Sequence, residues 1–230
     1  MALLALAPAA AYATEPTGGL EAGSSLITAT PTLVGETMEF AGTLSGSRHA
    51  IVEIQLRGAG GTWQRVASAR ADASGSFSAQ WPATQTGAFT ARAVNAGSAS
   101  TAQTTAIPTA PATVYRAAGA TWYDLSGRVG ACGVRLRKPT IGLAHRTLPC
   151  GTRVEVTYGG RTLTVPVIDR GPFVRGVSYD LTRAAADRLG FISAGRVRLG
   201  VLPQTERAPK SPLTAAPPSL GAAGGLTPAL

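Results

Sequence analysis

The sequence is poor in the residues that usually hold metals or carry redox chemistry. Its 230 residues include two cysteines, Cys132 and Cys150, and two histidines, His49 and His145. A metal site needs more ligands than these four, and the histidines lie far apart, so the sequence predicts no metal and no cofactor. Two cysteines 18 positions apart in one small segment of an exported chain favour a disulfide instead.

Long hydrophobic runs are absent after the first residues, so no membrane-spanning segment is expected. The opening run, MALLALAPAAAYA, is apolar and ends in small residues. It predicts a secretory signal peptide over residues 1–13, the alternative being a short membrane anchor, for which the run is too short. Thr14 stands where a lipid-anchored bacterial protein has cysteine. We therefore expect a secreted protein without a membrane anchor, associated with the cell wall.

Acidic residues are scarce, with 12 Asp and Glu against 21 Lys and Arg and a net charge of +9. Residues 116–202 hold 14 basic and 5 acidic residues, a net of +9, whereas residues 14–115 have a net charge of −1. A basic exported segment suits an anionic wall polymer such as peptidoglycan. Nucleic acid has the same charge, but export and the lack of a nucleic-acid motif argue against it.

The pattern of residues 14–94 predicts an immunoglobulin-like β-sandwich. Val52, Ile54 and Leu56 alternate with polar residues, and further short alternating runs are separated by glycine-rich turns. Trp63 and Trp81 are either sugar-binding platforms or core residues, and the core is favoured. No protein partner of this module can be named from its sequence.

Two segments have the composition of linkers. Residues 95–118 are rich in Ala, Thr, Ser and Pro and predict an extended linker, and the Pro- and Ala-rich residues 203–230 predict a disordered tail. Between them, residues 119–202 predict a second domain that is mostly β. Residues 153–158 and 161–168 form a predicted hairpin around Gly159-Gly160. Leu181, Ala185 and Leu189 predict a short helix, with Thr182 as its cap and Gly190 as its stop.

Five motifs follow one another in this second domain. They are Ala120-Thr121-Trp122-Tyr123, Ala144-His145-Arg146-Thr147-Leu148-Pro149, Gly151-Thr152-Arg153-Val154, Ile168-Asp169-Arg170-Gly171-Pro172-Phe173 and Asp180-Leu181-Thr182-Arg183-Ala184-Ala185-Ala186. In this order they resemble the RlpA-like (rare lipoprotein A) family over about residues 120–202. The resemblance implies a six-stranded double-psi β-barrel, shared with expansins, that acts on peptidoglycan.

The resemblance implies lytic transglycosylase activity, which cleaves between N-acetylmuramic acid and N-acetylglucosamine and leaves a 1,6-anhydro end. Asp169 matches the catalytic aspartate, and a single carboxyl group can serve first as acid and then as base. His145 matches the family histidine and either positions Asp169 or contacts substrate. From the residues alone, a structural role for Asp169, as a turn cap or as the partner of an arginine, is favoured over catalysis, and it is the motif match that favours catalysis.

Further residues are candidates for substrate binding, each with a structural alternative. Trp122, Tyr123 and Tyr179 either stack on sugar rings or pack in the core. Asp180 either assists as a second carboxylate, as in expansin-like barrels, or caps the helix, which we favour. Arg170 follows the catalytic position directly and is assigned to substrate.

The chain departs from the family pattern before the histidine motif. Val134 and Arg137 stand where catalytic members have Glu and Asp, and Cys132 replaces a serine. The departure defines either a disulfide-stabilised enzyme or a non-catalytic, expansin-like module that binds or loosens wall glycan.

Overall fold

A computed structural model of the chain describes residues 26–44, 47–96 and 108–204, which are mainly β-strand with one α-helix. The expected signal peptide, residues 97–107 of the expected linker and nearly all of the expected tail lie outside these residues. The strands are β1 (Leu26–Ala29), β2 (Thr32–Leu33), β3 (Thr37–Thr43), β4 (Ile51–Gly58), β5 (Gln64–Arg70), β6 (Ser76–Pro82), β7 (Gly87–Asn95), β8 (Ala110–Tyr123), β9 (Leu143–Ala144), β10 (Arg153–Tyr158), β11 (Arg161–Asp169), β12 (Tyr179–Thr182) and β13 (Val197–Pro203). The helix is α1 (Arg183–Leu189), followed by a single 3-10 turn, η1 (Ile192–Ala194).

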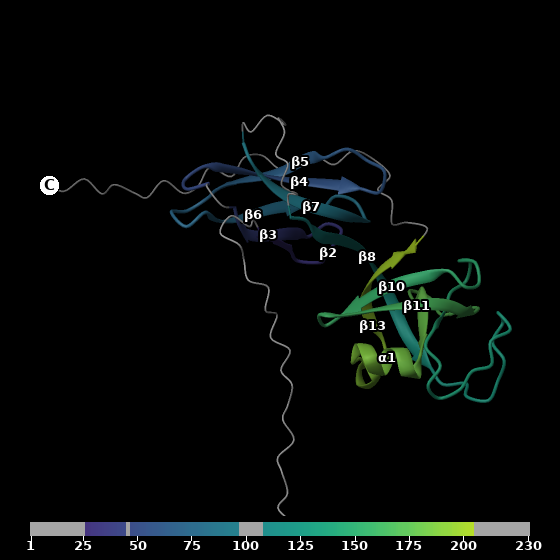
Figure 1. Cartoon of the computed structure of the whole chain (residues 1–230). Helices are drawn as coiled ribbons and strands as arrows, with labels where there is room; N and C mark the ends of the chain where they lie inside the picture. The colour runs from purple at the N-terminus through teal and green to yellow at the C-terminus, as the bar shows by residue number, and fades with distance from the viewer. Residues whose placement is uncertain (1–25, 45–46, 97–107, 205–230) are drawn as a thin grey trace, which may run out of the picture.

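The N-terminal part contains two sheets around one hydrophobic core (Figure 1). One sheet has the order β1-β3-β6, and the other runs β8-β7-β4-β5 with β2 added against β8. The alternation predicted for β4 is confirmed, because Val52, Ile54 and Leu56 are all fully buried. Trp81 is buried as well and meets Phe89 edge to face, with ring centroids 6.2 Å apart. Trp81 is therefore a core residue, as favoured.

Trp63 has a different environment from Trp81. It is half-buried, and the guanidinium carbons of Arg57 and Arg92 lie 4.5 and 4.2 Å from its ring centroid. Such cation–π contacts stabilise the side chains involved. The ring of Trp63 is thus already in contact with two cationic side chains of its own sheet.

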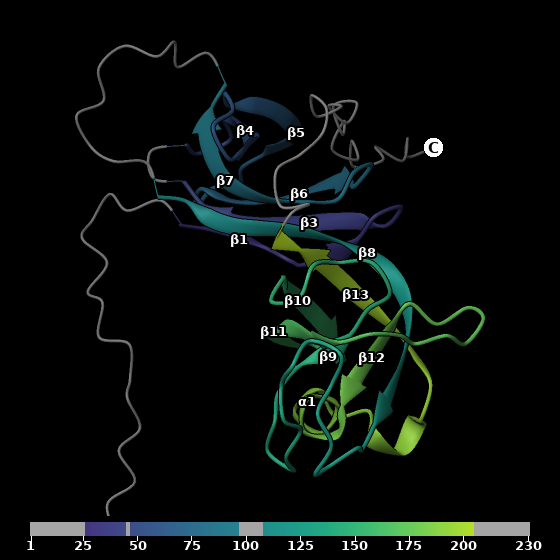
Figure 2. The same cartoon turned by 90° about the vertical axis from the view of Figure 1, so that its right-hand side faces the viewer.

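Strand β8 belongs to both parts of the molecule (Figure 2). Its first residues pair with β7 and β2, and its later residues pair with β13 and β12. Residues 110–118, which the composition assigned to a linker, are therefore strand. The physical reason is a period-two pattern of mostly small residues, since Ala110, Ala112 and Val114 are buried and the residues between them, Pro111 and Thr113, are exposed or half-buried. Small buried side chains gave the segment the composition of a linker.

Close contacts surround the point where β8 passes from one part to the other. The Tyr115 hydroxyl donates a hydrogen bond of 2.6 Å to Glu155 of β10, and the Tyr115 carbonyl accepts one from the Val34 amide. A Cβ on Gly200 of β13 would lie 2.6 Å from the Thr157 side chain of β10 and 3.0 Å from side-chain atoms of Leu33 and Tyr115. Glycine suits this position because a neighbouring barrel strand and the N-terminal part both approach it closely.

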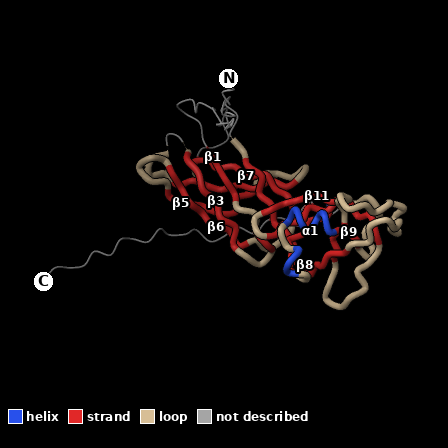
Figure 3. Tube along the Cα trace, turned by 90° about the horizontal axis from the view of Figure 1, so that it is seen from below, coloured by secondary structure: helices blue, strands red, loops and turns tan. Residues whose placement is uncertain are grey.

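The C-terminal part is a closed six-stranded barrel. Its cyclic order is β8-β13-β10-β11-β9-β12, and β12 closes the ring by pairing with β8. The pairs β8–β12 and β9–β11 are parallel, and the other neighbours are antiparallel. Buried side chains from all six strands and α1 fill the interior. Figure 3 shows α1 beside the barrel strands.

The local predictions for the barrel agree with the structure. The hairpin β10–β11 pairs Arg153 with Pro166 and turns at Gly159-Gly160, whose φ angles are 55° and 76°. Positive φ at both turn residues is the geometry that favours glycine in a two-residue hairpin. The Thr182 side chain accepts the Ala185 amide at the start of α1, and Gly190 ends the helix in the left-handed conformation. Leu181 lies just before the helix, in β12.

Candidate active site

The candidate site lies where β11 ends and β12 begins, beside β8. Asp169 is the last residue of β11, and Asp180 is the second residue of β12. Strand β9 lies between these two strands, with Ala144 opposite both Asp169 and Asp180. The fold thus brings together two carboxylates that are 11 positions apart in the sequence.

Asp169 is half-buried and held by backbone amides. Its Oδ1 accepts hydrogen bonds from the Ala131 amide at 2.7 Å and from the Arg170 amide at 2.8 Å. Ala131 belongs to a loop between β8 and β9 that crosses the end of β11. Gly130 permits this crossing, because a Cβ there would lie 2.9 Å from the Ile168 carbonyl oxygen and 3.2 Å from the Asp169 carboxyl carbon.

Asp180 is half-buried as well, but its carboxylate accepts from a side-chain hydroxyl rather than from backbone amides. Burial raises the pKa of Asp180, the hydrogen bond of 2.6 Å from the Thr121 hydroxyl opposes the rise, and the charge of Asp169 adds to it. The favoured role of Asp180 as helix cap is wrong, because Thr182 occupies the cap position. Asp180 is thus available as a second carboxyl group of the site.

Tyr123 connects this pair to the neighbouring surface. Its hydroxyl is buried and has no hydrogen-bond partner within the described residues. Burial raises the pKa of Tyr123, and the charges of Asp169 and Asp180 raise it further. The tyrosine therefore lies close enough to both carboxylates to interact with their charges, and its hydroxyl stays protonated.

His145 follows β9 and is fixed by its own loop. Its Nδ1 accepts the amides of Thr147 and Leu148 at 3.2 and 3.0 Å, so in the neutral ring the proton resides on Nε2. The His145 amide donates to the Asp169 carbonyl at 3.2 Å, which ties the two backbones together.

Tyr179, expected as a possible stacking residue, is instead part of the core. It is only 1% exposed, its ring lies 4.8 Å from that of His145, and Arg116 donates to its hydroxyl. Because the ring is enclosed, it offers no face to a sugar. Sequence alone did not reveal this, since an aromatic residue at a strand start suits either role.

Trp122 faces the opposite side of β8 from Tyr123. Its indole nitrogen donates to the Ile192 carbonyl at 3.0 Å, and the guanidinium of Arg183 lies 5.4 Å from its ring. It packs against the barrel core and is only partly exposed. Both of its roles, packing and contact with a ligand, are compatible with this position.

Arg170 holds the histidine loop in place. Its guanidinium donates to the carbonyls of His145 and Leu148 at 3.1 and 2.8 Å and lies 3.1 Å from the sulfur of Cys150. The expected disulfide is confirmed, with the sulfurs of Cys132 and Cys150 bonded at 2.04 Å. Arg170 and the disulfide therefore join the loops that carry Ala131 and His145.

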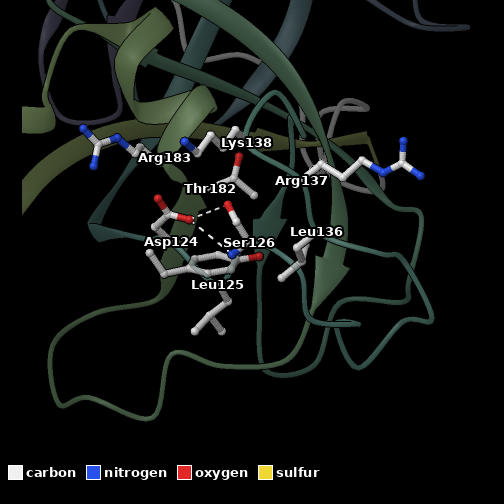
Figure 4. Close-up of a pocket in the computed structure, with 9 residues that line it drawn as sticks. Asp124, Leu125, Ser126, Leu136, Arg137, Lys138, Thr182 and Arg183 are labelled. Carbon is white, nitrogen blue, oxygen red and sulfur yellow. Dashed lines mark hydrogen bonds between the residues drawn. The ribbon is translucent and has the colours of Figure 1, made fainter.

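A small surface pocket, drawn in Figure 4, includes Thr182, which follows Asp180 by two residues in β12. It is lined by Tyr123, Asp124, Leu125, Ser126, Leu136, Arg137, Lys138, Thr182 and Arg183. Within the described ranges, no cluster of three or more His, Cys, Asp or Glu side chains is suited to a metal ion. No helix in the same ranges is long and apolar enough to cross a membrane.

Comparison with known proteins identifies the barrel. Residues 115–201 match the family model described as "Lytic transglycolase". The segment is 46% identical over 80 residues to the probable endolytic peptidoglycan transglycosylase RlpA of Aquifex aeolicus, covering 33% of this chain and 35% of that protein. The barrel is of the RlpA-like double-psi type.

A second relative of the RlpA-like barrel is the endolytic peptidoglycan transglycosylase RlpA of Neisseria meningitidis serogroup A, 36% identical over 86 residues, with 36% of each chain covered. This chain thus spans little more than a third of the length of either curated relative. Among solved structures, the Streptomyces papain inhibitor is 31% identical, covers 36% of this chain and 90% of its own, and has a TM-score of 0.31.

Proposed function

We propose that the RlpA-like barrel is a peptidoglycan lytic transglycosylase that cleaves between N-acetylmuramic acid and N-acetylglucosamine. The relatives are named peptidoglycan transglycosylases, and the motif around Asp169 is retained in full. The observation that carries the proposal is the pair of neighbouring carboxyl groups, Asp169 and Asp180, in two different environments. Two titratable groups in unlike environments are suited to opposite roles in proton transfer.

In place of the double role expected for Asp169 as acid and then base, we assign the proton donor to Asp180 and the acceptor to Asp169. The raised pKa of Asp180 lets it keep a proton to higher pH than an exposed aspartate. Asp180 protonates the glycosidic oxygen as the bond from that oxygen to the muramyl C1 breaks. The muramyl C6 oxygen then bonds to C1, and its proton passes to Asp169. No water is consumed, so the product carries a 1,6-anhydro end.

His145, Arg170 and the disulfide support this arrangement. Because Nδ1 of His145 accepts two amides, the Nε2–H is the ring group that can donate a hydrogen bond, either to Asp169 or to a sugar oxygen. Arg170 acts through the loop that it braces, so its contribution to substrate binding is indirect.

The test is release of anhydro-muropeptides from purified sacculi, measured by mass spectrometry. The wild-type chain is expected to release them, and folded Asp169→Asn is expected to release almost none. Equal rates for the two proteins would refute the role of Asp169.

A second candidate function is a non-catalytic glycan-binding or wall-loosening module of expansin type. It is favoured by Val134 and Arg137, both exposed on the loop that contacts Asp169, where the family pattern has two carboxylates. Binding to sacculi with no product from the wild-type chain would establish this alternative.

We further propose that the N-terminal part is immunoglobulin-like and that the protein is secreted to the cell wall. The sheet orders β1-β3-β6 and β8-β7-β4-β5 support the first point, although the sandwich would include residues 110–115 of β8 beyond the expected boundary at 94. The disulfide supports export to an oxidising compartment.

A further inference from the structure

The pocket beside the carboxylate pair is basic. Arg137, Lys138 and Arg183 line it with Asp124 as the only carboxylate, so its lining side chains carry a net charge of +2. No ion pair within the described residues joins any of the three cations to a carboxylate. Arg137 is also the position at which the chain reverses the charge of the family pattern.

The pocket and Asp180 share one face of the β8–β12 ladder. Tyr123 and Thr182 line the pocket and are partners in this parallel pairing, and Thr121 and Asp180 are partners two residues earlier. Residues two apart on a strand point to the same side and are separated by roughly 7 Å. A ligand group in the pocket would therefore lie roughly 7 Å from Asp180 along the strand.

Two of the cations converge on one side of the pocket. Figure 4 shows Lys138 and Arg183 extending on the side of Asp124, and Arg137 extending the other way. Hydrogen bonds from Ser126 lower the pKa of Asp124 most, and the charges of Arg183 and Lys138 lower it further. Lys138 and Arg183 thus both line the pocket, and both act on the Asp124 carboxylate.

An anionic glycan meets the charged carboxylates of Asp124 and Asp169 here, which repel it. Cationic side chains next to them offset this repulsion. We propose that Lys138 and Arg183 form a subsite for a carboxylate of the glycan strand, with Arg137 at its rim. This inference rests on the proposed function for the identity of the polymer. The carboxylate comes either from the lactyl group of a peptide-free muramyl residue or from a stem peptide.

The experiment compares the double variant Lys138→Gln/Arg183→Gln with a matched double variant, Arg161→Gln/Arg188→Gln. Arg161 and Arg188 are exposed, and Arg161 lies at the opposite end of β11 from Asp169. Single Lys138→Gln is included because Arg183 also contacts Trp122. The substrates are peptide-free glycan strands, the same strands with carboxylates converted to amides, and intact sacculi. KM and kcat for product release are measured together with equilibrium binding.

We expect the double variant to raise KM or Kd for peptide-free strands about tenfold, the loss of one charge-assisted contact, with kcat nearly unchanged. Amidated strands should bind both proteins equally. A defect confined to intact sacculi would identify the stem peptide as the source of the carboxylate. An equal defect on amidated strands, an equal defect in the Arg161/Arg188 variant, or no defect at all would overturn the subsite.

Binding separates this inference from the proposed function. If the wild type releases no product but binds carboxylate-bearing strands more tightly than the double variant does, the subsite stands and the enzyme proposal fails. If the wild type cleaves and the double variant matches it on every substrate, the subsite fails and the enzyme proposal stands.

Discussion

The carboxylate of Asp169 and the backbone amide of Ala131 are joined by a hydrogen bond of 2.7 Å across 38 residues of sequence. Ala131 precedes Cys132, whose disulfide to Cys150 fixes the loop that donates this bond. The segment that departs most from the family pattern therefore contacts the residue proposed to be essential. Gly130 and the disulfide of this segment can each be replaced to test its effect on Asp169.

Replacing Asp169 with Asn should reduce product release by about 10²–10⁴-fold, because the side chain keeps its shape but can no longer accept a proton. Anhydro-muropeptide release is the measurement, with circular dichroism to check the fold. Asp187→Asn, an exposed carboxylate on α1, is the matched control and should keep wild-type activity.

Asp180→Asn should change how stability depends on pH. The folded-state pKa of Asp180 lies above the ordinary value of 3.8, so the folded protein binds this proton more tightly than the unfolded chain. Its stabilising contribution is complete below about pH 3.8 and is lost as pH rises through the folded-state pKa. The variant should therefore gain stability relative to wild type between pH 3 and pH 7. Urea unfolding measures this difference, and a difference independent of pH would contradict it.

Gly130→Ala should lower activity while leaving the barrel folded. The added Cβ would lie 2.9 Å from the Ile168 carbonyl oxygen, so the loop must shift away from Asp169. Gly61→Ala, where the nearest atom would be 3.5 Å away, is the control. The prediction fails if both variants release product at the wild-type rate.

Removing the disulfide by Cys132→Ser/Cys150→Ser should destabilise the protein by about 3 kcal/mol, the chain-entropy estimate for a loop of this length. Thermal unfolding measures the loss. Reducing agent should lower the stability of the wild type and leave that of the double variant unchanged. An unchanged wild type under full reduction would show that the loop is held by other contacts.

Binding to sacculi should weaken as salt rises, because residues 116–202 carry the whole excess of positive charge. Pelleting of the full chain with sacculi between low and high salt tests this. A fragment beginning at Ala120 would lack the first ten residues of β8, so the full chain is the proper material. Binding that does not respond to salt would assign the contact to uncharged surface.

The sequence by itself determined the local elements of the barrel. Alternation around Gly159-Gly160 specified the hairpin, Thr182 and Gly190 specified the ends of α1, and Cys132 and Cys150 had no other partner for a disulfide. The hairpin and the helix ends depend on neighbours within a few residues, and the disulfide follows from the presence of two cysteines in the sequence. The five ordered motifs likewise identified the barrel type and singled out Asp169.

Only the tertiary structure decided the contacts between distant segments. Composition made residues 110–118 resemble a linker, but pairing with β7 and β13 made them a strand. The pairing of β8 with β12, which closes the barrel, placed the Thr121 hydroxyl within hydrogen-bond distance of Asp180, and it enclosed Tyr179 in the core. The physical reason is that burial and hydrogen-bond partners are set by strands that are neighbours in the barrel but far apart in the sequence. A period-two pattern fixes which side chains share a face, whereas the choice of partner strand fixes what that face meets.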